Sequence, residues 1–171
     1  CILESSLVYL LILAFMVYMN LSMDKWLVAV ITVGSNIIFH ILVSYPISAV
    51  CAGILIPVSS LVLYLYKKVI FVKYAKQVWE AAYGSIKWFW NYCISDTVKV
   101  DVFYSHIILV CCIILCSILI YLLATKWCKS LLTMVFGAAV LSFMWLYGYD
   151  EAFKYIQYYL FISFLLFSFT Q

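Results

Sequence analysis

The spacing of the ionisable residues constrains this 171-residue chain more than any other feature of its sequence. Five windows contain no Asp, Glu, Lys or Arg, and they cover residues 5–23, 26–66, 102–125, 130–149 and 155–171. A helix rises about 1.5 Å per residue, so about 20 apolar residues cross a hydrocarbon core roughly 30 Å thick. Four windows fit one crossing each, and the second window fits two. The pattern predicts an all-α polytopic membrane bundle of six transmembrane helices.

The composition agrees with lipid as the solvent of this chain. Its residues are 69% hydrophobic and 10% charged, whereas a soluble domain carries about 25% charged residues. In a single transmembrane domain over residues 1–171, the predicted spans are about 5–23, 26–43, 47–66, 102–124, 130–147 and 152–170. We expect spans one to three to form tight antiparallel hairpins, with Tyr45-Pro46 breaking the second helix and Pro57 bending the third.

The first apolar window is longer than the apolar region of about 7 to 15 residues that is typical of a signal peptide. We therefore expect it to remain as a membrane span. The chain opens at Cys1 without an initiator Met and stops at Gln171 with no flanking charge. This indicates a segment of a longer protein.

Residues 67–101 differ from the rest, because they hold nine of the seventeen charged residues. Four of these recur at helical spacing in one stripe: Lys73, Lys76, Glu80 and Lys87. Opposite them we expect an apolar stripe that includes Trp79, Tyr83 and Trp90. Lysines and aromatic rings in this pattern predict an amphipathic helix in the membrane interface over about 69–93. The alternative is a solvated connecting helix that packs on the bundle.

Polar residues inside the predicted spans are the candidate functional groups. Asn36 and His40 are four residues apart and share one face of the second span. Polar groups are costly in lipid unless they are partnered, so this pair indicates either a proton or ligand path or an interhelical hydrogen bond that fixes packing. In the fourth span, His106 lies near Asp101, which favours an interfacial histidine beside a carboxylate over a metal ligand.

No catalytic, cofactor-binding or metal-binding residue is predicted for this segment. Cys112 and Cys116 share a face, but a thiolate metal site would need further ligands and deprotonation in lipid. The sequence has no H-E-x-x-H motif, no G-x-S-x-G motif and no glycine-rich phosphate loop. Its basic residues are all lysines, which argues against a nucleic-acid partner because such sites favour the arginine fork. The lipid bilayer is the expected partner.

Two charge signals disagree on orientation. With six crossings, the loops after spans one, three and five share a side and carry eight of the ten lysines. The positive-inside rule then predicts these loops in the cytoplasm and the N-terminus outside. The compact turn that holds Lys126 and Lys129 argues for the reverse orientation.

The layout also resembles a known family. Two stretches carry most of the likeness: I-K-W-F-W-N-Y at 86–92 and F-M-W-L-Y-G-Y-D-E-A-F at 143–153. With the three close spans and the basic turn, they resemble the N-terminal membrane region of bacterial transglutaminase-like membrane proteins over nearly the whole chain. The resemblance implies a bacterial cytoplasmic membrane, an N-terminus inside and segment 67–101 outside. It also implies a downstream extracytoplasmic domain with a papain-like Cys, His and Asp triad, of which this chain contains no part.

The leading functional hypothesis is a membrane anchor and scaffold that holds a C-terminal soluble domain of the same protein at the membrane. A small transporter or carrier subunit with a polar path at Asn36 and His40 is the alternative. A membrane enzyme that acts on lipid is a third class, and it is disfavoured because no pair of titratable groups is placed to work together.

Overall fold

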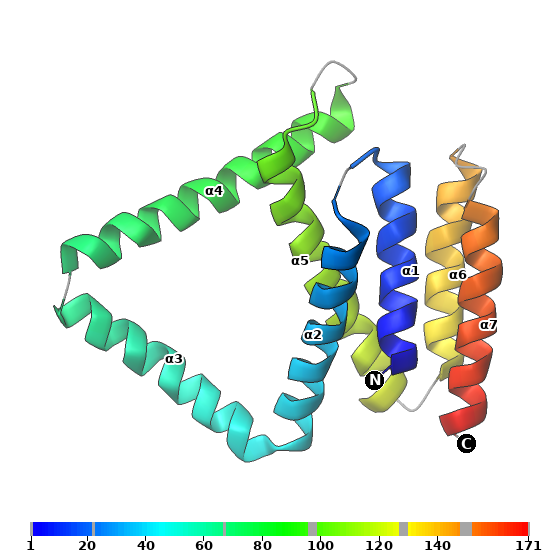
Figure 1. Ribbon diagram of the computed structural model, residues 1–171, viewed down its shortest axis with the longest axis horizontal. Helices are drawn as coiled ribbons and strands as arrows, with labels where there is room; N and C mark the ends of the chain where they lie inside the picture. Colours follow the sequence, from blue (N-terminus) through cyan, green and yellow to red (C-terminus); the bar gives the residue numbers. More distant parts are fainter. Residues whose placement is uncertain are drawn as a thin grey trace. The chain divides into compact units, whose positions relative to one another are not determined.

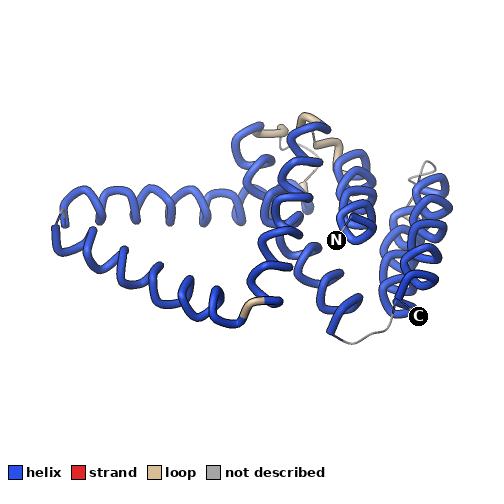
Figure 2. The backbone as a smooth tube through the Cα atoms, turned by 60° about the horizontal axis from the view of Figure 1, so that its bottom comes forward, coloured by secondary structure: helices blue, strands red, loops and turns tan. Residues whose placement is uncertain are grey.

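The computed structural model describes residues 2–21, 23–66, 68–95, 99–126, 130–147 and 152–170. Within these ranges every regular element is helical (Figure 1; Figure 2). The elements are α1 (Ile2–Tyr18), α2 (Lys25–Ser44), α3 (Pro46–Tyr66), α4 (Lys68–Ile94), α5 (Val102–Tyr121), the π-helical turn η1 (Leu122–Lys126), α6 (Ser130–Leu146) and α7 (Ala152–Thr170). The predicted all-α class is confirmed.

Local chemistry fixes where several helices begin. Asp24 caps α2, since its Oδ1 atom accepts a hydrogen bond from the backbone N–H of Trp26 at 3.0 Å. Asp101 caps α5 in the same way, accepting from the N–H of Phe103 at 2.9 Å. Both carboxylates also suit the positive end of a helix dipole. α3 begins at Pro46, in the first turn, where the missing N–H has no intrahelical partner to lose.

The end of α1 differs from the predicted span over 5–23, because the helix stops at Tyr18. Asn20 has a φ of 49°, in the left-handed region that asparagine adopts more readily than most residues. The N–H of Leu21 donates to the carbonyl of Met16 at 2.8 Å, and the N–H of Asn20 donates to the carbonyl of Val17 at 3.1 Å. This pair of bonds is a Schellman motif, which ends a helix without a charge or a proline.

The remaining bounds agree with the predicted segments to within a few residues. α4 covers the predicted interfacial helix, and α7 coincides with the sixth span. The fourth span is helical from Val102 into η1, whose wider π-type turn the sequence pattern does not predict. The turn residues 127–129 and the carboxylates of Asp150 and Glu151 lie outside the described residues.

The chain divides into two compact units, residues 1–39 with 109–171 and residues 40–108. In the first unit, α6 and α7 pack against each other and α1 packs on both, so that the three helices lie side by side (Figure 1). Fully buried side chains from all three form the core, including Leu7, Leu141 and Tyr159. The α1–α2 hairpin is more open than predicted, because the close partner of α1 is α7 and a cavity separates α1 from α2.

The second unit contains α3, α4 and the first turns of α5. α4 has 27 residues and is held near both ends. Near its start, the rings of Tyr64 and Phe71 pack edge to face with centroids 5.8 Å apart. Near its end, Trp88 Nε1 donates to the carbonyl of Lys99 at 3.3 Å, and Tyr104 lies against Gly84.

Among the described residues, two helices are long and apolar enough to cross a membrane: Lys25–Ser44 and Val102–Ala124. Shorter apolar helices are Ile2–Tyr18, Gly53–Val62 and Leu131–Leu146. The two longer helices give limited support for a membrane protein, because length and composition alone define them. The number of six crossings stays a prediction.

Candidate functional site

α4 presents three faces, because residues three or four apart share one side of a helix. Its apolar face carries side chains that are each between 63% and 73% exposed: Trp79, Tyr83, Ile86 and Trp90. Its charged face is also exposed and carries Lys73, Lys76, Glu80 and Lys87. Its third face turns toward α5 and carries Gly84, Ser85, Trp88 and Tyr92. We call the first two faces together the exposed α4 surface.

The lysine stripe lies beside the aromatic stripe and not opposite it, which corrects the sequence-based expectation. At 3.6 residues per turn, the two stripes are about a quarter turn apart. The side of α4 that would be opposite the aromatic stripe packs on the start of α5. There Ser85 is 1% exposed, and a methyl group on Gly84 would come within 3.0 Å of the Tyr104 hydroxyl. The exposed α4 surface is therefore continuous, since no packed face separates its two stripes.

The exposed α4 surface carries a net positive charge. Its three lysines outnumber Glu80, whose Oε1 atom lies 3.8 Å from Nζ of Lys76. These two side chains are 63% and 76% exposed, so solvent screens the pair and it adds little stability.

A cluster of rings fixes the end of α4. Trp88 stacks on Tyr92 with ring centroids 5.2 Å apart, and it lies 6.4 Å from the ring of Tyr104. Cys93 follows directly and is exposed on the side of Trp90. Partial burial raises the pKa of the Cys93 thiol above its ordinary value. The cluster therefore holds a thiol in place next to the aromatic stripe.

Asn36 and His40, the two polar residues that the sequence analysis pairs on α2, differ in burial. Asn36 is 1% exposed, and its Nδ2 atom donates to the carbonyl of Thr32 at 2.9 Å and to the hydroxyl of Ser117 on α5 at 3.4 Å. Its Oδ1 atom has no hydrogen-bond partner in the described part of the chain. His40, one turn further along, is exposed. The structure thus gives Asn36 a contact between α2 and α5.

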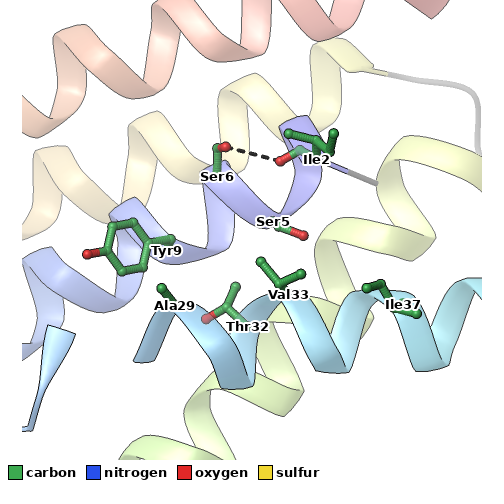
Figure 3. Close-up of a pocket in the computed structure, with 8 residues that line it drawn as sticks. All are labelled: Ile2, Ser5, Ser6, Tyr9, Ala29, Thr32, Val33 and Ile37. Carbon is green, nitrogen blue, oxygen red and sulfur yellow. Dashed lines mark hydrogen bonds between the residues drawn. The ribbon is translucent and has the colours of Figure 1, made fainter. Parts of the chain in front are cut away.

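A cavity of about 400 Å³ lies between α1 and α2 (Figure 3). It is lined by Ile2, Ser5, Ser6, Tyr9, Ala29, Thr32, Val33 and Ile37. Two of its hydroxyls bond within their own helices, from Ser6 to the carbonyl of Ile2 at 3.0 Å and from Thr32 to the carbonyl of Val28 at 2.7 Å. Among the described residues, the lining holds no carboxylate, imidazole, thiol or amine, so this cavity suits an apolar occupant better than a reaction.

The α6–α7 contact was not foreseen from the sequence. Tyr159 is fully buried and its hydroxyl donates to the carbonyl of Thr133 at 2.8 Å. A Cβ atom on Gly137 would overlap the Tyr159 ring, so only glycine leaves room for it. The signal lay in the run Gly137-Ala138-Ala139, since small residues in a bulky span mark close helix approach.

The other predicted polar residues do not assemble. The Asp101 carboxylate caps α5, and His106 is half-buried further along that helix. Cys111 is exposed, while Cys112 and Cys116 are half-buried. In the described ranges, no group of three or more His, Cys, Asp or Glu side chains could hold a metal ion.

Comparison with known proteins finds no match: no family model fits the sequence, and neither a curated protein nor a solved structure resembles it. The likeness to transglutaminase-like membrane proteins therefore rests on the sequence layout alone. It transfers no catalytic role to any residue of this chain.

Proposed function

We propose that this chain is a multi-pass membrane domain that anchors and positions a soluble domain at the membrane surface. In this proposal the bundle crosses the bilayer six times, and α4 lies in the interface. The domain supplies placement and not chemistry.

The distribution of apolar and polar side chains carries the proposal. Each of the helices α1 to α7 exposes large apolar side chains, among them Ile56, Leu65 and Leu115, which are 68%, 73% and 65% exposed. The interior of the first unit instead includes polar residues such as Asn36 and Ser117, which contact each other. In water such a surface would aggregate. In lipid the apolar surface is solvated, and polar groups gain by turning inward to one another.

The exposed α4 surface supports the interfacial part of the proposal. Its tryptophans and tyrosine are amphipathic rings that prefer the headgroup region. Its lysines can extend their apolar stems over the rings and keep their ammonium groups in water. A helix that merely connected two spans through water would gain nothing by exposing four large apolar side chains in one line.

Topology mapping tests the proposed crossings. In a cysteine-free variant of the full protein, single cysteines replace Asp24, Tyr45, Lys99, Lys129 or Tyr147, and a membrane-impermeant maleimide is added before and after permeabilisation. Lys99 is exposed in the loop that follows α4. Six crossings require positions 24, 99 and 147 to label from one side and positions 45 and 129 from the other. Labelling of positions 24 and 99 from opposite sides would overturn six crossings. Release of the protein from membranes by alkaline carbonate would overturn the membrane assignment itself.

The identity of the anchored domain is also a proposal, and it rests on the resemblance to transglutaminase-like membrane proteins. We expect an extracytoplasmic transglutaminase-like domain on the same polypeptide, in a bacterial cytoplasmic membrane. Deleting residues 1–171 from the full-length protein should release that domain from the membrane fraction. If the remainder stays membrane-bound and active, the anchoring role is wrong.

A further inference from the structure

We propose that the exposed α4 surface binds the headgroups of anionic phospholipids, so that α4 docks on a negatively charged leaflet in preference to a neutral one. The inference rests on the proposed function, because it takes α4 to lie at the membrane interface. It adds the chemical identity of the surface that α4 recognises.

The arrangement of the two stripes is the first step. When the line of Trp79, Tyr83, Ile86 and Trp90 enters the boundary of the acyl chains, a stripe a quarter turn away lies level with the headgroups. Lys73, Lys76 and Lys87 occupy that stripe. A stripe opposite the rings would point away from the bilayer, beyond close reach of the phosphates. The observed neighbouring arrangement is the one that lets rings and lysines contact one leaflet together.

Charge is the second step. The charged stripe has three exposed lysines and a single carboxylate, and Lys67 and Lys68 precede it in the sequence. Groups of four to eight basic residues on an amphipathic helix are typical of anionic-lipid recognition. Each lysine near a negatively charged surface strengthens docking by about fivefold. Glu80 opposes this attraction from the same stripe.

Rigid presentation is the third step. The ring contact of Tyr64 with Phe71 and the cluster around Trp88 hold α4 near both of its ends. These contacts favour a helix that is already formed when it meets the headgroups, which lowers the ordering cost of docking.

The test uses the single thiol of Cys93, which is exposed on the side of the aromatic stripe. In the full protein every other cysteine, including the six others in residues 1–171, is replaced by alanine, and Cys93 carries the environment-sensitive dye NBD. The protein is placed in nanodiscs of phosphatidylcholine, with or without phosphatidylglycerol. Emission wavelength and quenching by lipids spin-labelled near the headgroup report whether the end of α4 is docked. We expect deeper docking in the anionic discs and its weakening as salt is raised.

Charge variants separate lipid recognition from general stability. The triple variant Lys73→Gln, Lys76→Gln and Lys87→Gln should lower the equilibrium constant between docked and undocked α4 in anionic discs by roughly a hundredfold. Glu80→Gln should strengthen it by about fivefold. The control replaces Lys126 and Lys129, which six crossings would put at the opposite leaflet, and should leave docking of α4 unchanged.

Two results would overturn the inference, and they differ in what they leave standing. Equal, salt-insensitive docking in both kinds of disc would remove the anionic preference while the interfacial placement of α4 survived. A water-like NBD signal in both kinds of disc would remove the interfacial placement as well.

Discussion

Under the proposed membrane placement, single buried residues decide how the helices of the first unit pack, because lipid provides no hydrophobic drive between helices. Gly137 is the sharpest case, since its missing side chain leaves the space that the Tyr159 ring occupies. We expect Gly137→Ala to destabilise the α6–α7 pair by about 1–3 kcal/mol through overpacking. Thermal unfolding in detergent, followed by circular dichroism, measures the loss.

Gly34→Ala is the matched control, because no heavy atom lies within 4 Å of the added methyl group. Alanine also favours a helix over glycine by about 1 kcal/mol, so this variant should unfold at the same temperature or a higher one. In a Tyr159→Ala background the penalty of Gly137→Ala should disappear. A penalty that persists there would mean that the ring contact is not its cause.

Asn36 distinguishes a packing role from a transport path. Its bond to Ser117 is long at 3.4 Å and its Oδ1 atom is unpartnered. Leucine, which has a similar branched shape, therefore removes this weak contact, the 2.9 Å bond to the Thr32 carbonyl within α2, and one buried unpartnered atom. We expect Asn36→Leu to change the unfolding free energy by less than about 1 kcal/mol. Asn36→Asp buries a charge and should lower the free energy of unfolding by on the order of 3 kcal/mol, which is several times the change expected for Asn36→Leu. Under the transporter alternative, Asn36→Leu would instead abolish uptake while stability held.

At the scale of the element, helix starts were easier to predict than helix ends. Asp24 and Asp101 are charges at the edge of apolar windows, so the same residues that mark the windows also cap α2 and α5. The end of α1 has no such marker. Asn20 sits in an uncharged run, and only its left-handed backbone stops the helix. Counting charges therefore extended the first span too far.

The Schellman motif makes a prediction of its own. Asn20→Gly should keep or raise stability, because glycine adopts a positive φ without steric cost. Asn20→Val should lower the free energy of unfolding by about 1–2 kcal/mol, since a branched side chain is strained at a φ of 49°. The same two substitutions at Leu3, which is half-buried in the first turn of α1, serve as the comparison for the effect of glycine and valine at an ordinary helical position. Equal melting temperatures for the two Asn20 variants would contradict this account of the helix end.

α4 shows what periodicity can and cannot supply. The charges and rings of the predicted interfacial helix gave its extent, because they repeat with the helical period. Their relative placement was wrong by about a quarter turn, although residue spacing at 3.6 residues per turn already puts the two stripes side by side. The sequence pattern does not reveal that Gly84 and Ser85 pack on α5, and this contact occupies the side that we expected the lysines to fill.

The thiol of Cys93 gives α4 a pH-dependent signature. Partial burial raises the pKa of this thiol, so at a given pH a smaller fraction is thiolate than for a free cysteine. Maleimide labelling of the detergent-solubilised protein should be slower than labelling of a free thiol near neutral pH. The rate should rise about tenfold per pH unit and level off only above the raised pKa. A plateau below the pKa of the free thiol would contradict the local burial.

At the scale of the whole molecule, the apolar windows predicted the helices but not their partners. α1 packs on α7, which comes from the far end of the chain, and the gap between α1 and α2 is a cavity. Partner choice in lipid depends on small and polar side chains at a few positions, such as Gly137, and not on the total apolar content. Uniformly apolar faces carry little of that information.

The side of the membrane on which α4 lies is a property of the whole molecule. Eight of the ten lysines would share that side, and the cytoplasmic leaflet carries the negative surface potential that an anionic-lipid-binding helix seeks. Both arguments predict α4 in the cytoplasm and, with six crossings, both chain ends outside. A soluble domain after residue 171 would then be extracytoplasmic without a further span. The turn of Lys126 and Lys129 and the family resemblance predict the opposite orientation.

In intact cells that carry a cysteine at Lys99 as the only cysteine, we therefore expect no labelling by an impermeant maleimide until the membrane is permeabilised. A cysteine at Tyr45 should label at once, and it serves as the positive control from the opposite side. Residue 99 is exposed in the loop that follows α4 and lies outside the aromatic stripe, so docking of that stripe in lipid does not shield it. Immediate labelling of position 99 from outside would overturn the lysine argument and favour the resemblance, because its family topology requires α4 on the outer face.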